Sequence, residues 1–456
     1  MEDLEALFAK ALKLESPWKI TRVEFQEGEG VIKVFVDFPK GSVFRCPVCG
    51  KEAKAYDTTE KEWRHLNFFQ YACYLTVRVP RTDCPSDGKL QIDVPWAREG
   101  ADFTFLFESL AMTLVREMPV NKVSQIIKVD DNKLWRMMHY YTEAARERED
   151  HSGVNQIGVD ETSKTRGHDY VSLFVDLAKR RTIFVVEGKG SETMTAFTQD
   201  FKEHHGNPDD ITDVSIDMSP AFIKGVAENL PKAVITFDKY HILKIINVAV
   251  DQVRKAEAKQ QDILRGQKYL FLKNRQNLTE PQLKTLNSLE SMPRLNLKTI
   301  RAYHIRENFQ GIYKEETQAG FESALNKWYF WATHSRMEEI KEAAKTIKRH
   351  WAGVLRWFDS KINNGILEGL NSLIQAAKAK ARGYRTFKNL KTIIYMLTGK
   401  LDYAKLGLPT PNEKEPVYLS IPRCRPRMYD ISPACPASSV TSCINIEPTM
   451  SSKGGR

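Results

Sequence analysis

Three carboxylate residues carry the clearest chemical signal in the sequence. Asp160 ends the run Gln-Ile-Gly-Val-Asp and Asp217 ends Val-Ser-Ile-Asp; both runs are apolar and β-branched, as buried strands are. Glu368 lies far downstream in the helical pattern Gly-Ile-Leu-Glu-Gly-Leu-Asn. Hard divalent cations prefer carboxylate oxygens. Two strand-borne aspartates and a helix-borne glutamate are therefore typical of a phosphoryl-transfer site that holds two Mg²⁺ or Mn²⁺ ions.

Strand alternation separates Asp160 from its neighbour Glu161. Adjacent residues on a strand point to opposite faces of the sheet, so the two carboxylates are not expected to share a metal. Asp160 is the better candidate, because Val159 and Glu161 then lie together on the other face. Asp160 alone could be a strand-end carboxylate that caps a turn, but the second aspartate, Asp217, favours a metal site.

Asp238 and His241 form a further polar cluster, in Thr-Phe-Asp-Lys-Tyr-His at the end of another predicted strand. Asp238 could cap the following helix, or it could orient a metal ligand from behind. His241 could contact a phosphate or a metal-bound water. Neither residue is predicted to be a direct metal ligand.

A second metal site is predicted near the N-terminus. The motif Cys46-Pro-Val-Cys49-Gly presents two thiolates from one tight loop, which suits tetrahedral Zn²⁺. The motif Cys84-Pro-Ser-Asp87-Gly has the same shape, with Asp87 where a fourth Cys or His would stand. His65 and Cys73 are alternative ligands, and a knuckle-shaped loop without metal is the competing interpretation. The odd count of seven cysteines fits a reducing cytosol better than a disulfide framework.

Composition favours a polyanionic partner. The 456 residues carry a net charge of +10 and the pI is near 9.0, which is most simply explained by nucleic acid binding. No run of about 18 apolar residues is present, and the acidic N-terminus does not match a signal peptide. We therefore expect a cytoplasmic protein with no membrane partner.

Residues 17–100 are predicted to be β-rich, with strands at Val31–Phe38 and Tyr71–Val79. From residue 102 the apolar period becomes helical: Asp102 can cap a first helix and Pro119 breaks it. The next two helices are joined by the short turn Lys128-Val-Asp-Asp, which predicts a helix-turn-helix, with an ordinary helical hairpin as the alternative. Exposed positions of the third helix that could contact bases or phosphates are Asn132, Lys133, Arg136 and His139.

Residues 155–260 alternate between strand and helix, which implies a mixed sheet with helices on both faces. Residues 250–375 are predicted to be almost all helical, with a break around Arg275–Asn296. From residue 409 prolines are frequent and the tail is expected to be irregular. The predicted elements are strands at Gln156–Asp160, Tyr170–Leu177 and Arg181–Glu187, a helix at Thr193–His204, a strand at Asp213–Asp217, a helix at Pro220–Asn229, a strand at Ala233–Phe237 and a long helix from His241.

A basic stretch follows Glu368, and Gly383 is expected to end the helix that bears this residue. Cations beside the active site would neutralise phosphates near the scissile one, although a solvated basic helix face would look the same. The cations proposed to contact DNA are Lys378, Lys380, Arg382 and Arg385.

These motifs together resemble the DDE-class bacterial insertion-sequence transposases of the ISL3 family, over about residues 40–400. Besides the cysteine motifs, the resemblance rests on Glu62-Trp-Arg-His-Leu, Val94-Pro-Trp-Ala, Gly158-Val-Asp-Glu, Ser215-Ile-Asp-Met-Ser, Phe237-Asp-Lys-Tyr-His and Glu368-Gly-Leu-Asn through Arg382-Gly-Tyr-Arg. It implies that Asp160, Asp217 and Glu368 are the DDE triad. Asp87 departs from the family, where the second zinc half usually ends in Cys or His.

The resemblance implies a multidomain α+β protein with a zinc-ribbon-like β module, a helix-turn-helix and a ribonuclease H-like catalytic domain interrupted by an all-helical insertion. The expected boundaries are 1–100 for the zinc-binding module, 101–150 for the helix-turn-helix, 151–250 and 361–408 for the two parts of the catalytic domain, 251–360 for the insertion and 409–456 for the Pro-rich tail.

The implied function is a DNA transposase that binds the terminal inverted repeats of its element and performs metal-dependent strand cleavage and strand transfer. Asp160 is expected to bridge two Mg²⁺ ions, with Asp217 and Glu368 each holding one. The partners would be double-stranded DNA, as element ends and target, and a second copy of the chain, in the bacterial nucleoid. The alternatives are a nuclease of the same fold without strand transfer and an inactive DNA-binding regulator.

Overall fold

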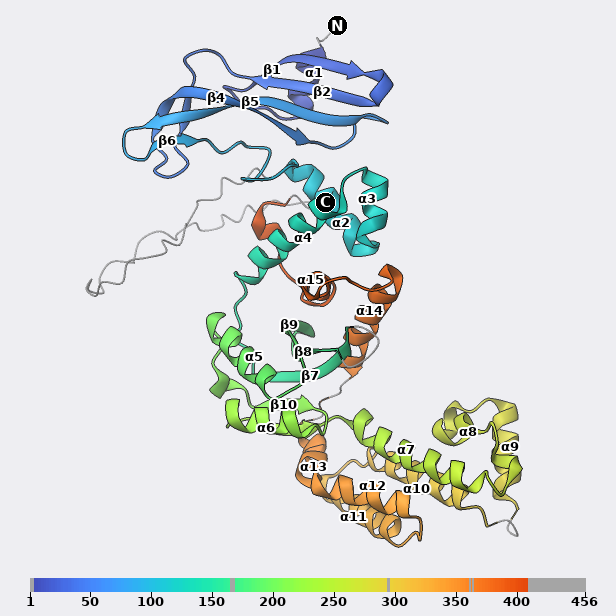
Figure 1. Ribbon diagram of the computed structural model, residues 1–456. Coiled ribbons are helices and arrows are strands. Elements are labelled where there is room, and N and C mark those ends of the chain that lie inside the picture. The colour runs from blue at the N-terminus through green and yellow to red at the C-terminus, as the bar shows by residue number, and fades with distance from the viewer. Residues whose placement is uncertain (1–3, 165–168, 293–295, 361, 363–364, 409–456) are drawn as a thin grey trace, which may run out of the picture.

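The computed structural model describes residues 4–164, 169–292, 296–360, 362 and 365–408. Figure 1 shows a blue N-terminal sheet at the top, cyan helices below it, a green sheet near the centre and an arm of yellow and orange helices at the bottom. This mixed α+β architecture agrees with the sequence prediction. No described helix is both long and apolar enough to cross a bilayer. The predicted irregular tail lies outside the described residues.

The N-terminal sheet has the strand order β1-β2-β5-β4-β3, with β6 paired to β5. Alternate residues of β2, namely Ile32, Val34 and Val36, are buried, as the two-residue period of a strand requires. The two predicted strands correspond to β2 and β5, and β5 runs on to Cys84. The bounds are α1 Leu4–Ala11, β1 Lys19–Gln26, β2 Val31–Asp37, β3 Val43–Arg45, β4 Glu52–Arg64, β5 Ala72–Cys84 and β6 Gly88–Gln91.

Three helices follow, and the first does not begin where the sequence predicted. The hydroxyl of Thr104 accepts a hydrogen bond from the N–H of Phe107, so Thr104 is the N-cap and the prediction for Asp102 is wrong. Asp102 is instead within ion-pair distance of Lys133 and Arg136 on the third helix. The helices are α2 Phe105–Glu117, α3 Val120–Ile127 and α4 Asp131–Arg146.

The turn between α3 and α4 is as predicted. Lys128 ends α3 in the left-handed conformation (φ +54°), and Asp130 begins α4 by accepting a hydrogen bond from the N–H of Asn132 (3.0 Å). The three helices share one apolar core, to which Phe107 and Leu134 contribute. This arrangement supports the helix-turn-helix rather than an isolated hairpin.

The second sheet has the order β11-β10-β7-β8-β9. Strands β7, β10 and β11 are parallel, and β8 and β9 continue the sheet in antiparallel fashion from β7. The predicted element order is confirmed, but the predicted end of the first strand at Asp160 is wrong, because β7 continues to Ser163 and pairs there with β8. The bounds are β7 Gln156–Ser163, β8 Tyr170–Asp176, β9 Arg181–Glu187, α5 Glu192–Glu203, β10 Asp213–Ile216, α6 Pro220–Asn229, β11 Val234–Phe237 and α7 Lys239–Glu257.

Helices cover both faces of this sheet, as predicted. On one face Phe197 of α5 and Phe222 of α6 share a core with Val159 of β7 and Ile216 of β10. The other face carries two helices from much later in the chain, α14 (Gly365–Ala381) and α15 (Phe387–Thr398). There α15 packs against β8 and β9, and the same apolar core continues into α2–α4. The helix-turn-helix therefore rests on the second sheet through α15.

Between β11 and α14 the described elements are helices. The predicted break around Arg275–Asn296 is not continuous, because α9 occupies 11 of its residues, starting from a capping box between Thr279 and Gln282. The arm returns to the sheet where α13 packs on β11, with Gly353 against the ring of Phe237. The remaining helices are α8 Lys268–Leu272, α9 Glu280–Glu290, α10 Lys298–Ile312, α11 Gln318–Thr333, α12 Glu338–Arg349 and α13 Trp351–Ser360.

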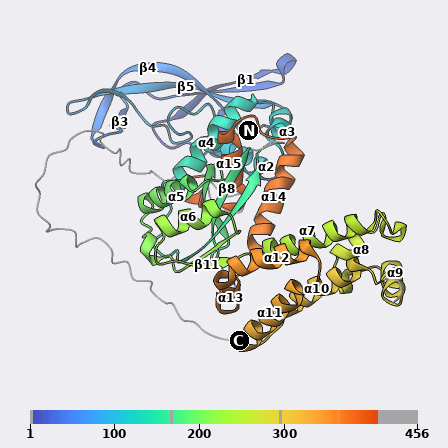
Figure 2. The same ribbon diagram turned by 60° about the horizontal axis from the view of Figure 1, so that its bottom comes forward.

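Helix α14 runs beside the second sheet (Figure 2), where it contacts strand β7. Four helical residues rise about 6.0 Å and two strand residues about 6.6 Å, so the two elements stay in step. Side chains spaced by four on α14 meet residues spaced by two on β7: Leu367 meets Gly158, Asn371 meets Asp160 and Gln375 meets Thr162.

Close docking of α14 depends on Gly158. A Cβ atom there would lie 2.8 Å from Cδ1 of Leu367 and 2.9 Å from Cδ2 of Leu177, both buried. We expect Gly158→Val to lower the free energy of unfolding by about 1–3 kcal/mol in urea denaturation. Gly153→Val is the matched control, since nothing lies within 4 Å of its Cβ position. Equal stability of the two variants would contradict the tight contact.

Candidate active site

The second sheet brings three aspartates to one level. β10 pairs in parallel register with β7 on one side and with β11 on the other. Continued past the last paired residues, this register sets Asp217 opposite Asp160 and opposite Asp238. Residues in register on neighbouring strands face the same side, here the face covered by α14. Two of the three predicted triad members thus lie in one row, together with the predicted supporting aspartate.

Asp160 is the most constrained of the three. One carboxylate oxygen accepts the N–H of Glu161 (2.8 Å), and the other accepts the side-chain amide of Asn371. Burial raises the pKa of Asp160, and the negative charges of Asp238 and Asp217 add to the effect. Carboxylates that disfavour one another's ionised form in this way would be stabilised by a divalent cation.

Asp217 and Asp238 are held by the turns that follow their strands. Asp217 lies directly after β10 and accepts the N–H of Ser219 (2.9 Å). Asp238 is the N-cap of α7, one of the two roles considered for it, and accepts the N–H of Tyr240 (2.9 Å). Its second oxygen lies 3.2 Å from Nδ1 of His241.

His241 is the imidazole that lies beside the acidic row, against Asp238. Asp238 raises the pKa of this imidazole, and the charges of Asp160 and Asp217 act in the same direction. His241 is half-buried on the first turn of α7. It is placed to stabilise the acidic row or to contact a phosphate that approaches it.

Glu368 approaches this row from the side of Asp238. It lies on the first turn of α14, next to Leu367, and faces solvent. Partial desolvation and then the charge of Asp238 raise its pKa, while His241 lowers it. Glu368 thus interacts electrostatically with Asp238 and His241, on the face of the sheet that also carries Asp160 and Asp217.

Two residues near the site were not assigned a role from the sequence. Asn371 was part of a recognised motif, and only the spacing of four between Leu367 and Asn371 on a helix could have suggested that it faces β7. Glu161 lies on the opposite face from Asp160 by alternation, yet its pKa is raised to about 6, first by burial and then by the charge of Asp217. Strand alternation alone would place Glu161 apart from the acidic row, but its carboxylate still interacts with the charge of Asp217.

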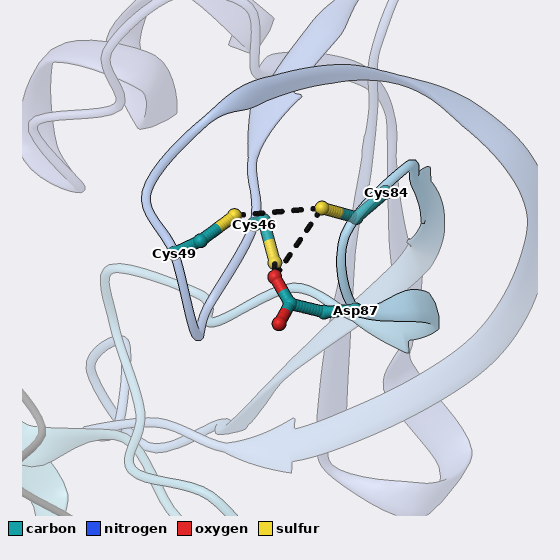
Figure 3. A group of neighbouring side chains, drawn as sticks. All are labelled: Cys46, Cys49, Cys84 and Asp87. Atoms are coloured by element: carbon teal, nitrogen blue, oxygen red, sulfur yellow. Dashed lines mark hydrogen bonds between the residues drawn. The ribbon is translucent and has the colours of Figure 1, made fainter.

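The N-terminal cysteine motifs form a compact cluster (Figure 3). Oδ2 of Asp87 lies 3.4 Å from Sγ of Cys46 and 3.3 Å from Sγ of Cys84, and Sγ of Cys49 lies 3.4 Å from Sγ of Cys84. All four donor atoms lie within 4.8 Å of one another. A tetrahedron with Zn–S bonds of about 2.3 Å has edges of about 3.8 Å, so the donor set fits zinc.

The structure distinguishes Asp87 from the two alternative fourth ligands. His65 is turned toward the helix-turn-helix, where Nδ1 is 2.8 Å from the hydroxyl of Thr104, and burial lowers its pKa to about 4. Cys73 lies in the apolar core of the sheet, where burial raises its pKa to about 11. Neither belongs to the cluster, so Asp87 completes it.

The predicted DNA-contacting face of α4 is only partly exposed. Asn132, Lys133 and Arg136 face solvent, and the pairing of the two cations with Asp102 is a weak surface interaction that a phosphate could replace. The expectation that His139 is exposed is wrong. Its ring nitrogens lie 2.8 Å from Thr392 and 3.1 Å from Asn389, because α15 covers this part of α4.

The basic stretch is likewise divided between internal and exposed cations. Lys378 donates hydrogen bonds to the carbonyl (2.6 Å) and hydroxyl (3.1 Å) of Ser163, and Lys380 donates to the carbonyl of Glu117. These two lysines therefore hydrogen-bond α14 to β7 and to α2. Arg382 and Arg385 remain exposed.

The predicted end of α14 is confirmed. Gly383, at φ +96°, donates its N–H to the carbonyl of Lys378 (2.8 Å).

Three family models match consecutive parts of the chain. They are a zinc-finger of transposase IS204/IS1001/IS1096/IS1165 at residues 42–87, a helix-turn-helix domain of transposase family ISL3 at residues 92–142 and an ISL3 transposase domain at residues 157–394. The class of protein that this fold and site define is a DNA-binding transposase. Since the last model alone spans more than half of the chain, the chain belongs to the ISL3 family of transposases.

Curated relatives agree with this assignment. The chain is 26% identical over 420 residues to the transposase for insertion sequence element IS1557 of Mycobacterium tuberculosis, a match that covers 83% of this chain and 92% of the relative. It is also 26% identical over 377 residues to the transposase for insertion sequence element IS1001 of Bordetella parapertussis, covering 80% and 91%. The zinc-finger model and the cluster of Cys46, Cys49, Cys84 and Asp87 together indicate a structural zinc site.

A fourth zinc ligand can be replaced by another residue that zinc accepts, and this tests the role of Asp87. We expect Asp87→Cys to retain zinc, because it restores a four-thiolate set, whereas Cys46→Ser should lose about one equivalent per chain. Elemental analysis of the purified chain measures both. Cys73→Ala is the control and should keep its zinc. Loss of zinc from Cys73→Ala but not from Cys46→Ser would contradict the assignment.

Proposed function

We propose that the chain cuts and rejoins DNA at the ends of its own element by metal-dependent phosphoryl transfer, with Asp160, Asp217 and Glu368 as the catalytic residues. The observation that carries this proposal is the register of the second sheet. It aligns Asp160, inside β7, with Asp217, directly after β10, on the face where α14 brings Glu368. All three residues fall within the matched transposase region.

The order β9-β8-β7-β10-β11, with three antiparallel strands followed by two parallel ones, supports a ribonuclease H-like catalytic domain. The helices α7–α13, between Asp238 and Glu368, would then be an insertion into that domain. Because α7 continues without interruption from the end of β11 to Glu257, we place the start of the insertion at α7 rather than at residue 251. The zinc module and the helix-turn-helix would precede the catalytic domain.

The acidic row fits divalent cations, since its members are oxygen donors and disfavour one another's charge. Two Mg²⁺ or Mn²⁺ ions held by Asp160, Asp217 and Glu368 would stabilise the attacking and leaving oxygens of an in-line displacement. The amide of Asn371 fixes the orientation of the Asp160 carboxylate. His241 balances part of the negative charge and can donate to a phosphate oxygen.

The proposed reaction has two displacements at phosphorus. In the first, water forms a new P–O bond as the bond to the 3′-oxygen of the element end breaks, which frees a 3′-hydroxyl. In the second, this hydroxyl forms a P–O bond to target DNA while a target 3′-oxygen leaves. The first step replaces the 3′-oxygen on phosphorus by the oxygen of water and leaves a 5′-phosphate, and the second replaces one ester oxygen by another, so no covalent enzyme intermediate and no redox partner are required.

Recognition of the inverted-repeat ends would fall to α4 and the zinc module. Asn132 and Arg136 are exposed on the first half of α4, as residues that read bases must be. Arg382 and Arg385 would neutralise phosphates near α14. Both ends of the element must be held for joining, so we propose a dimer on DNA.

The proposal predicts that Asp160→Asn abolishes strand cleavage and leaves binding of the element end intact, because the substitution removes a charge but not the fold. Cleavage of an end-containing duplex in Mg²⁺ and a gel-shift assay measure the two properties. Asp209→Asn, an exposed change before β10, at the end of that strand opposite to Asp217, is the control and should cleave normally. Full cleavage by Asp160→Asn would refute the metal-ligand role.

A pre-cut end carrying a free 3′-hydroxyl tests the joining step separately. A transposase should insert this end into target DNA, and Asp160→Asn should not. Cleavage without joining would instead favour a nuclease of the same fold, and failure of the wild type in both assays would favour a DNA-binding regulator.

Asn371 offers a test of how Asp160 is positioned. Its amide nitrogen donates to Asp160, and its Oδ1 is buried without a hydrogen bond among the described residues. We expect Asn371→Ser to raise the Mg²⁺ concentration needed for half-maximal cleavage by about 10–100-fold, as loss of a group that orients a metal ligand does. Ser372→Ala, on the exposed side of α14, is the control. An unchanged Mg²⁺ requirement in Asn371→Ser would show that the contact is only structural.

A further inference from the structure

A second group of metal-ligating side chains lies away from both sites described above. We propose that His151, Asp200 and His204 hold a transition-metal ion, most simply Zn²⁺, that pins the segment following α4 to helix α5. One donor atom from each residue lies within 4.8 Å of the others. Two imidazoles and a carboxylate form a nitrogen- and oxygen-rich set that suits zinc with a further position for water.

The sequence places these ligands on two elements. Asp200 and His204 are four residues apart at the C-terminal end of α5, which sets them on one face of the helix. His151 lies in the segment between α4 and β7, and its N–H donates to the carbonyl of His204 (2.8 Å). The two imidazole rings are nearly parallel, with centroids 5.1 Å apart.

His151 is the strongest indication of a missing ligand. Its side chain is 1% exposed, and within the described part of the chain neither ring nitrogen makes a hydrogen bond. The nearest charged group is Glu149, with Oε2 3.5 Å from Nε2. A buried polar group left unsatisfied costs about 1–3 kcal/mol, so native proteins rarely retain one. A metal at Nδ1, with Nε2–H directed toward Glu149, would satisfy both nitrogens.

His204 lies beside the Asp200 carboxylate. Its Nδ1 donates to the main-chain carbonyl of Asp200 (2.7 Å) and lies 3.4 Å from Oδ2 of the same residue. That bond fixes the tautomer in which Nε2 carries the free lone pair, the usual outer-sphere support of a ligating imidazole. Only 12% of the His204 side chain is exposed.

The principal competitor for Asp200 is Arg146, which contacts both carboxylate oxygens at 3.0 and 2.7 Å. Each carboxylate oxygen has two lone pairs, so Asp200 can accept Arg146 and still bind a metal. Arg181 pairs with Glu149 nearby and adds a second positive charge. We therefore expect this site to bind zinc more weakly than the cysteine cluster does.

Zinc stoichiometry of the full-length chain tests the proposal. Wild type saturated with Zn²⁺ and then gel-filtered in excess Mg²⁺, which competes for the carboxylates of the acidic row, should retain about two Zn²⁺ ions, and His204→Asn and the double variant Cys46→Ser/Cys49→Ser should each retain about one. His205→Asn is the matched control, because His205 is exposed beside His204 and adopts a left-handed φ of +64° that Asn tolerates. It should bind as many ions as the wild type. A count that His204→Asn does not lower overturns the proposal, and the stacked histidines are then only packing.

Cobalt substitution separates loss of a ligand from loss of fold. In the Cys46→Ser/Cys49→Ser chain, with excess Mg²⁺ present to occupy the carboxylates of the acidic row, Co²⁺ at the histidine site should give ligand-field absorption without a thiolate charge-transfer band. Adding His204→Asn should abolish this absorption while the circular dichroism stays native. A thiolate band, or absorption that survives His204→Asn, would place the second ion elsewhere and overturn the proposal.

Discussion

The alignment of helix α14 with strand β7 is the constraint on which the rest of the catalytic region depends. Four residues of a helix and two residues of a strand rise by nearly the same distance, and these steps keep α14 and β7 matched from Gly158 to Thr162. Gly158 lets the helix approach, and Asn371 joins it to Asp160. Because Glu368 follows Leu367 directly, the same contact that packs the helix also sets the position of its carboxylate.

The helix-turn-helix is built into the catalytic body rather than attached by a flexible segment. The first half of α4 presents Asn132 and Arg136 to solvent, whereas His139 in the second half is fixed to α15. At its end Arg146 is bonded to Asp200 of α5. One continuous helix thus connects the residues proposed to read DNA with the sheet that carries the aspartates, and its stiffness leaves little freedom between them.

The sequence predicted the second sheet closely, because its strands are short apolar runs whose ends are marked by Asp, Pro and Gly. It also assigned Asp160 and Asp217 to one metal site and the two cysteine motifs to another, because each of these signals is contained in a short motif. Its errors arose from tertiary contacts. His139 has the helical position of an exposed residue, and Lys378 belongs to a basic run, but α15 and Ser163 engage them from elsewhere in the chain. Asp102 was a plausible cap, yet Thr104 took that role. The residues around Glu161 in the sequence do not indicate that the charge of Asp217 raises its pKa.

The arm of helices between β11 and α14 separates the proposed catalytic carboxylates along the chain. Asp160 and Asp217 emerge from the ribosome early, but Glu368 and Asn371 follow only after the whole arm has been synthesised. A nascent chain therefore carries its DNA-binding helices before it can complete the acidic face. Synthesis order alone would keep an unfinished transposase from cutting the DNA that it already recognises.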